Sequence, residues 1–125
     1  MIKNLLLISL FISNLYSQNI SWYSNYDKAL ILAQNEKKNL FVLLVDEKEE
    51  SKKLLANLYK KKEFVNLLNK RFISILININ YKISYPIELY YTTRFPTIFI
   101  VDSKLELVLK EPIYNINSLE ELKLF

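Results

Sequence analysis

The stretch from Asp46 to Ser51 carries the side chains best suited to chemistry, with carboxylates, an amine and a hydroxyl in close succession. Paired carboxylates can transfer protons or hold a hard cation such as Ca²⁺ or Mg²⁺, and the Lys48 amine could act as a nucleophile. One hypothesis is therefore a carboxylate- or metal-dependent enzyme at the Asp46–Glu50 corner. A polar turn that leads into a solvated helix gives the same pattern without chemistry, and the sequence favours this second interpretation.

Several residue types that catalysis commonly needs are missing from the chain. None of its 125 residues is cysteine, histidine or glycine. Thiol chemistry, a histidine base and an ordinary zinc site are therefore excluded, and so are glycine-rich phosphate loops. We expect no cofactor, no metal site and no catalytic residue. Without glycine, Asn and Asp should carry any left-handed turns.

The charged residues indicate a solvated surface rather than a nucleic-acid-binding face. Lys and Arg number 17 against 13 Asp and Glu, which gives a net charge of +4. The lysines are interspersed with glutamates along the expected helices, a balance that mainly supports solubility. Lysine clusters at 37–38, 52–53 and 60–62 could touch an anionic surface, but we expect no nucleic-acid partner.

The N-terminal residues 1–17 have the composition of a secretory signal peptide. One lysine precedes an apolar stretch from Leu5 to Ile12, and small and polar residues follow up to Ser17. The apolar stretch is too short to span a bilayer comfortably. We therefore expect an exported protein, periplasmic or secreted, with one domain over residues 18–125. The alternative is an uncleaved anchor, and we expect membrane contact only through such a leader.

Apolar spacing at the start of that domain predicts a helix followed by a buried strand. A helix capped by Ser24 or Asn25 should end near Asn35, because its apolar residues fall on one face at helical spacing. The six apolar residues from Leu40 to Val45 predict a strand that is covered on both faces.

The rest of the domain continues the alternation of helices and strands. The segment after the Asp46–Glu50 corner predicts an amphipathic helix that breaks near Lys61 or Lys62, and an apolar strand over 72–79 follows. Such a strand, helix, strand unit is typical of an α/β fold. The elements expected after it are, in chain order, a short helix from Pro86 to about Tyr91, an antiparallel hairpin of Thr97–Val101 with Leu105–Leu109, and a short terminal helix capped by Ser118.

This order of elements and three segments of the sequence resemble the thioredoxin-like family. The segments read WYSNYDKALILAQNEKKNLFVLLV, EFVNLLNKRFISILININ and YYTTRFPTIFIVD, and the last has the family's proline and threonine before an apolar strand. The chain is similar to a secreted thioredoxin-fold protein that lacks the C-x-x-C motif. The resemblance implies an α/β fold in which a central mixed β-sheet of about four strands is flanked by helices.

The resemblance also implies where a functional site would lie. The C-x-x-C position falls on Lys48-Glu49-Glu50-Ser51, so lysine and serine stand where redox members have thiols. Neither side chain can exchange disulfides, and we therefore expect no disulfide oxidoreductase activity. In the family the proline that matches Pro96 is cis and faces the active site, which implies a cis Phe95–Pro96 bond in this chain.

These features favour a non-catalytic module, chaperone-like or assembly-related, that binds a protein or an extended peptide. Family members pair with an extended strand beside the cis proline, and backbone pairing needs no cysteine. One alternative is a structural subunit in an envelope redox pathway. Another is that Pro96 only shapes the entry of a strand while the tyrosines pack in the core or on the surface. The residues expected to line or border the groove are Arg94, Phe95, Pro96, Thr97, Tyr90 and Tyr91.

Overall fold

The structure is a computed structural model that describes residues 19–115 and 120–125. A five-stranded mixed sheet lies at the centre of this part of the chain, with the strand order β1-β3-β2-β4-β5. Strands β1 and β2 pair parallel with β3, whereas β4 pairs antiparallel with both β2 and β5. The strands are β1 (Trp22–Tyr23), β2 (Asn39–Val45), β3 (Phe72–Asn78), β4 (Thr97–Asp102) and β5 (Leu107–Val108).

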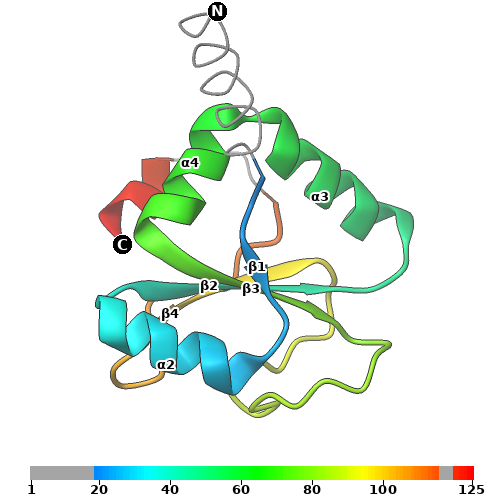
Figure 1. Cartoon of the computed structure of the whole chain (residues 1–125). Helices are drawn as coiled ribbons and strands as arrows, with labels where there is room; N and C mark the ends of the chain where they lie inside the picture. Colours follow the sequence, from blue (N-terminus) through cyan, green and yellow to red (C-terminus); the bar gives the residue numbers. More distant parts are fainter. Residues whose placement is uncertain (1–18, 116–119) are drawn as a thin grey trace, which may run out of the picture.

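Helices cover both faces of the sheet, as Figure 1 shows. Helix α2 (Tyr26–Glu36) lies on one face, and α3 (Glu49–Lys60) and α4 (Lys62–Arg71) lie on the other. The predicted break in the long helix is confirmed, because Lys61 leaves helical geometry between α3 and α4. The predicted α/β architecture is confirmed with it.

The two faces of β2 supply two separate apolar clusters. Successive side chains of a strand point to opposite faces, so alternate residues of β2 enter different clusters. Phe41 and Leu43 belong to the cluster on the side of α3 and α4, and Val42 and Leu44 belong to the cluster on the side of α2. The unbroken apolar run in the sequence is therefore explained by burial on both faces.

The ends of α2 show how the chain manages without glycine. The Asn25 carboxamide accepts a hydrogen bond from the Lys28 amide at 3.0 Å, which confirms one of the two predicted caps. At the other end Lys37 adopts a left-handed conformation with φ 55°. This conformation lets the amides of Lys37 and Lys38 reach carbonyl groups of the last helical turn. The expectation that Asn and Asp would carry left-handed turns was wrong, since Lys37 and Glu106 do so in the part of the chain described.

Two further expectations differ from the structure, and a third is confirmed with a shorter strand. Strand β1 adds a fifth strand to the predicted four, because two residues are too few to show an alternating pattern in the sequence. The segment from Pro86 to Tyr91 forms a turn rather than a helix, with two amides bonded to the Pro86 carbonyl while Tyr90 is drawn into the core. The predicted hairpin is confirmed, although β5 is only two residues long.

The chain ends in a short 3-10 helix, η1 (Glu120–Leu124), at the place of the predicted short terminal helix. The predicted cap at Ser118 and the predicted leader over residues 1–17 lie outside the described residues. Over 19–115 and 120–125, no helix combines the length and the apolar character that a bilayer crossing requires.

Candidate functional site

The turn between β2 and α3 is held by a reciprocal pair of hydrogen bonds. The Ser51 hydroxyl donates to Asp46 Oδ1 at 2.7 Å, and the Asp46 amide donates to Ser51 Oγ at 3.2 Å. The same carboxylate oxygen accepts the Lys48 amide at 3.1 Å. Ser51 is 1% exposed, so its hydroxyl is shielded from solvent and its hydrogen bonds are made within the turn. The two side chains best placed for catalysis thus stabilise the start of a helix.

The electrostatics of this turn do not favour acid–base or nucleophilic chemistry. The hydrogen bond from Ser51 holds the pKa of the Asp46 carboxyl below its ordinary value of 3.8. A carboxylate with a lowered pKa is a weak base and does not activate a serine hydroxyl. Over the described residues, no three potential ligands are grouped so as to hold a metal ion. No observation therefore supports an enzyme at the Asp46–Glu50 corner.

Lys48 and Ser51 occupy defined positions at the amino end of α3. Lys48 is the N-cap residue and makes no capping hydrogen bond with its side chain, and Ser51 lies in the first turn. Glu49 and Glu50, in the same turn, complement the positive end of the helix dipole. The positions that resemble a redox pair are thus at a helix N-terminus, with a solvated cation at the first and a buried hydroxyl at the second.

A second turn, before β4, faces this helix start. The Phe95–Pro96 peptide bond is cis. The Arg94 carbonyl accepts hydrogen bonds from the hydroxyls of Thr97 and Thr92, and the Arg94 amide donates to Thr92 Oγ1 at 3.2 Å. Among the described residues, no group hydrogen-bonds to the amide or the carbonyl of Phe95. The turn is therefore fixed on both sides of Phe95 while the main chain of Phe95 itself has no partner there.

Two hollows meet at this pair of turns. The first, which we name the corner hollow, has a volume of about 490 Å³ and is lined by Asp46, Lys48, Glu49, Glu50, Thr93, Arg94 and Phe95. The second, which we name the α3 groove, has a volume of about 530 Å³ and is lined by Glu50, Lys53, Leu54, Asn57, Lys60, Lys61, Pro96, Tyr114 and Asn115. Glu50 borders both hollows, and the neighbouring residues Phe95 and Pro96 line one hollow each. The two hollows therefore adjoin at the Phe95–Pro96 bond.

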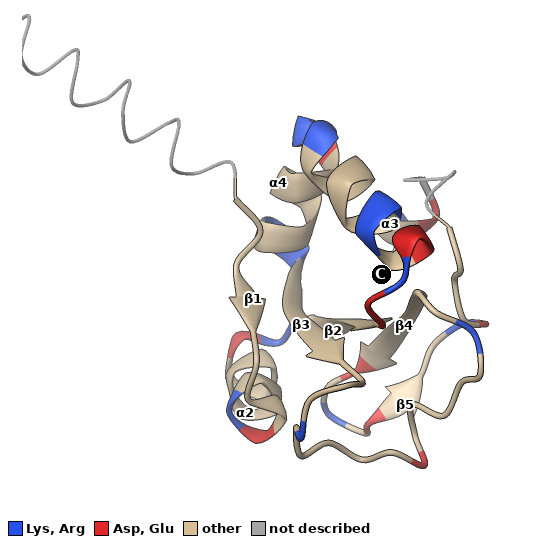
Figure 2. Cartoon of the chain, turned by 90° about the vertical axis from the view of Figure 1, so that its right-hand side faces the viewer, with Lys and Arg blue, Asp and Glu red and all other residues tan. Residues whose placement is uncertain are grey.

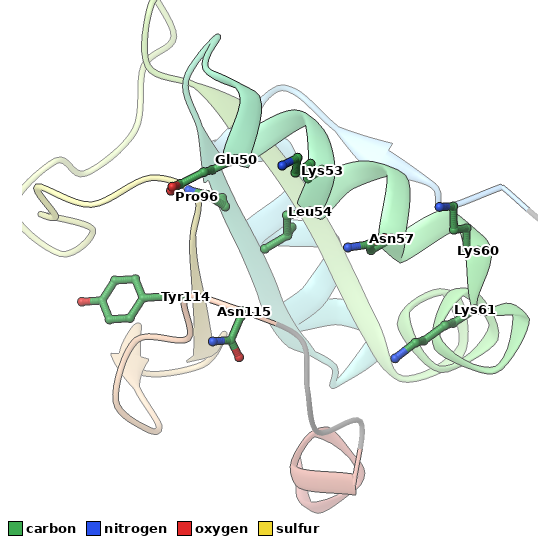
Figure 3. A pocket seen from close by; sticks show the side chains of 9 residues that line it. All are labelled: Glu50, Lys53, Leu54, Asn57, Lys60, Lys61, Pro96, Tyr114 and Asn115. Atoms are coloured by element: carbon green, nitrogen blue, oxygen red, sulfur yellow. The ribbon is translucent and has the colours of Figure 1, made fainter.

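Figure 3 shows the layout of the α3 groove. Glu50 and Pro96 lie near one end, and Lys60 and Lys61 lie at the far end of the helix. Tyr114 and Asn115 come from the chain after β5 and lie across the groove from α3. The Arg94 guanidinium stacks over the Tyr114 ring with its central carbon 3.9 Å from the ring centroid, which ties this wall to the proline turn.

The structure distributes the six residues predicted around Pro96 over different environments. Arg94 and Phe95 line the corner hollow, and Pro96 lines the α3 groove. Thr97 is buried and hydrogen-bonds to the Arg94 carbonyl, so it shapes the turn without lining either hollow. Tyr91 is 73% exposed but borders neither hollow.

The expectation for Tyr90 was wrong, because this side chain is 1% exposed and lies in the core. Its hydroxyl is 2.7 Å from the Tyr26 hydroxyl, which in turn donates to Glu106 Oε1 at 3.2 Å. Burial raises the pKa of Tyr26 to about 12 and also raises the pKa of Tyr90. A chain of hydroxyls that ends on a surface carboxylate satisfies both phenols, so Tyr90 has a structural role.

Sequence reasoning missed most of the α3 groove. The helix residues of that groove recur every three or four positions, and this spacing could have revealed one continuous face. Tyr114 and Asn115 have no such signal. Their place depends on the bridge between Ile98 and Ile113, which carries the chain after β5 back alongside β4.

Comparisons with solved structures identify the fold. A DsbH oxidoreductase superposes with a TM-score of 0.66 at 16% identity, over 80% of this chain and 76% of that one. A thioredoxin from Thermus thermophilus superposes with a TM-score of 0.53 at 20% identity, over 66% of this chain and 64% of that one. No protein-family model and no curated protein sequence matches the chain. The predicted thioredoxin-like fold is thereby confirmed.

Proposed function

We propose that this chain, a thioredoxin-like fold without cysteine, is a non-catalytic module that binds an extended peptide or protein segment at the Phe95–Pro96 turn. The observation that carries the proposal is the main chain of Phe95, whose amide and carbonyl have no hydrogen-bond partner among the described residues. An extended segment can pair with such groups through its own backbone, as in strand addition to a sheet edge.

The surroundings of Phe95 support a binding role. Two adjoining hollows give a bound segment room to continue in both directions from the turn. Arg94 is exposed, but its guanidinium is held against the Tyr114 ring. Binding a partner would therefore cost this side chain little conformational entropy. Arginine and aromatic residues are the types that most often dominate the energy of protein interfaces.

The chemistry at the helix start supports binding without catalysis. Lys48 and Ser51 carry no thiol, and the Ser51 hydroxyl is committed to Asp46. Disulfide exchange requires a thiolate attacker. The turn therefore recognises a segment without forming or breaking a covalent bond.

Export is part of the same proposal, supported by the leader-like composition of residues 1–17. A binding module outside the cytoplasm would meet extended segments of other exported proteins. N-terminal sequencing of the mature protein tests this part. A start near Gln18 or Asn19 supports cleavage and export, and an intact Met1 in the cytoplasmic fraction contradicts it.

Site-specific photocrosslinking tests the binding role. A photoreactive side chain at Thr93, which lines the corner hollow, should crosslink to partner segments in extracts of the producing cells. The same group at Ile31, an exposed residue of α2, is the matched control because α2 covers the other face of the sheet. Crosslinks that are specific to position 93 support the proposal, and equal yields or none at the two positions contradict it. Thermal melting of both variants verifies that each is folded.

A further inference from the structure

The wall that α3 contributes to its groove is one continuous helical face with an uneven distribution of charge. Its members recur at intervals of three or four residues, so they line up along the helix. They are Glu50, Lys53, Leu54, Asn57 and Lys60 of α3, followed by Lys61 directly after its last turn. The wall's one carboxylate, Glu50, stands at the end next to Pro96, and three lysines, interrupted by Leu54 and Asn57, follow it along the wall. Figure 2 shows the same order along the whole helix, which begins acidic and ends basic.

The groove lysines take part in no ion pair in the described part of the protein. Ion pairs there join Lys110 to Glu121 and Lys123 to Glu63, and neither involves Lys53, Lys60 or Lys61. All three side chains are exposed. Three like charges along one wall create a positive potential in the groove, which an acidic partner would relieve.

The dimensions of the groove suit an extended chain that starts at Phe95. From Glu50 to Lys60 the helix advances by about 15 Å, at about 1.5 Å per residue. An extended strand covers the same distance in roughly five residues. A segment that pairs with the Phe95 main chain therefore reaches the groove lysines within about two to five residues.

We infer that the α3 groove extends the peptide site and selects segments that carry acidic side chains two to five residues, roughly, from the residue paired with Phe95. This inference rests on the proposed binding function and adds the chemical class of the ligand. The acidic side chains lie along Lys53, Lys60 and Lys61, and the residue that passes Glu50 is neutral or basic.

The composition of the groove favours a polypeptide over a nucleic acid. Glu50 stands where a continuous phosphate backbone would have to pass between the two hollows. One face of the Tyr114 ring is already covered by Arg94, although single-stranded nucleic acids depend on open aromatic faces for stacking. Leu54 and Asn57 instead provide the mixture of apolar and amide contacts that suits side chains of a peptide.

Fluorescence anisotropy with labelled peptides tests the inference. One probe has alternating valine and threonine residues followed by glutamates, the second has glutamines in place of the glutamates, and reversed versions cover both strand directions. The test variant is Lys53→Gln/Lys60→Gln. The control Lys52→Gln/Lys70→Gln removes the same charge from exposed lysines that do not line the groove.

The expected result is preferential binding of one glutamate probe that depends on the groove lysines. Two exposed ion pairs should be worth roughly fivefold in affinity at low salt. The test variant should lose about this factor, the control variant should lose less than about twofold, and about 0.5 M salt should abolish the preference. Circular dichroism melts verify that both variants are folded.

The opposing results separate this inference from the proposed function. Equal binding of glutamate and glutamine probes overturns the charge preference while the peptide site stands. No binding of any probe overturns the charge preference and contradicts the peptide site as well. A single-stranded oligonucleotide that binds as tightly as the glutamate probe, with the same dependence on Lys53 and Lys60, overturns the choice of a peptide ligand.

Discussion

Replacing Ser51 by alanine should destabilise the protein more than its small size suggests. The hydroxyl donates to Asp46 Oδ1 at 2.7 Å and accepts the Asp46 amide at 3.2 Å, and Ser51 is almost fully buried. A hydrogen bond to a charged group is worth about 1.5–3 kcal/mol. We expect Ser51→Ala to lower the free energy of unfolding by about 2 kcal/mol at neutral pH.

Ser74 provides a matched control for this substitution. It is also buried, but its hydroxyl has no hydrogen-bond partner among the described residues. Removing an unsatisfied buried hydroxyl relieves a desolvation cost, so Ser74→Ala should be neutral or slightly stabilising. The difference between the two variants isolates the hydrogen bonds of Ser51 from the loss of an oxygen atom.

The cost of Ser51→Ala should also depend on pH. The pKa of Asp46 in the folded protein lies below its ordinary value of 3.8, chiefly because Ser51 donates to the ionised form. A group with a depressed pKa contributes stability that is present above its unfolded pKa and is lost as the pH falls through the folded pKa. The penalty of Ser51→Ala should therefore be constant near neutrality and should shrink below about pH 4.

Urea unfolding followed by the fluorescence of Trp22 measures these differences. Trp22 is the only tryptophan, and its indole N–H donates to the Tyr59 hydroxyl of α3 at 2.7 Å, so its emission reports the packing of β1 against that helix. A penalty for Ser51→Ala that equals the effect of Ser74→Ala, or that stays unchanged down to about pH 3, would refute the assigned hydrogen-bond network.

Two further predictions concern stability. Replacing both Tyr26 and Tyr90 by phenylalanine should reduce the loss of stability in alkali. The raised pKa values of the two tyrosines contribute stability that is fully present below about pH 10, the pKa of an unfolded tyrosine, and that is lost as the pH rises toward the folded pKa. In that range the free energy of unfolding of the wild type should fall by about 1.4 kcal/mol per pH unit for each tyrosine. Urea unfolding at alkaline pH measures this, and parallel slopes for the two proteins would contradict it. Lys37→Gly should stabilise the protein by about 0.5 kcal/mol, since φ 55° costs a residue with a β-carbon but not glycine. A lower melting temperature for that variant would contradict the expected relief.

The sequence alone specified most of the fold because the strongest signals were local. The six-residue apolar run of β2 is buried on both faces, and a run of that kind is visible without any knowledge of its neighbours. The polar break at Lys61 likewise marks the end of α3. Strand β1 was not predicted because it forms by pairing with β3, a segment about fifty residues away.

The candidate site could be predicted only in part, for the same reason. The resemblance to thioredoxin-like sequences pointed to Lys48 and Phe95, which the structure brings to one hollow. The second wall of the α3 groove depends on where the chain returns after β5, and no local pattern around Tyr114 encodes that path. The position of Tyr90 could not be predicted either. Its hydroxyl can be buried because it hydrogen-bonds to the hydroxyl of Tyr26, a residue distant in the sequence.

A thiol placed at position 48 is the sharpest probe of a peptide site beside Pro96. Lys48→Cys puts one cysteine at the N-cap of α3, where the helix dipole lowers the thiol pKa, beside the turn proposed to bind peptides. The matched control is Lys28→Cys, an exposed position on α2. The measurement is the rate of exchange of each variant with a small disulfide and with a disulfide carried by an extended acidic peptide.

We expect Lys48→Cys to react faster than Lys28→Cys with both reagents. The ratio of the two rates should be larger, by about tenfold, for the peptide disulfide, because binding raises its local concentration at the thiol. An equal ratio of rates with the two reagents would contradict a peptide site beside Pro96.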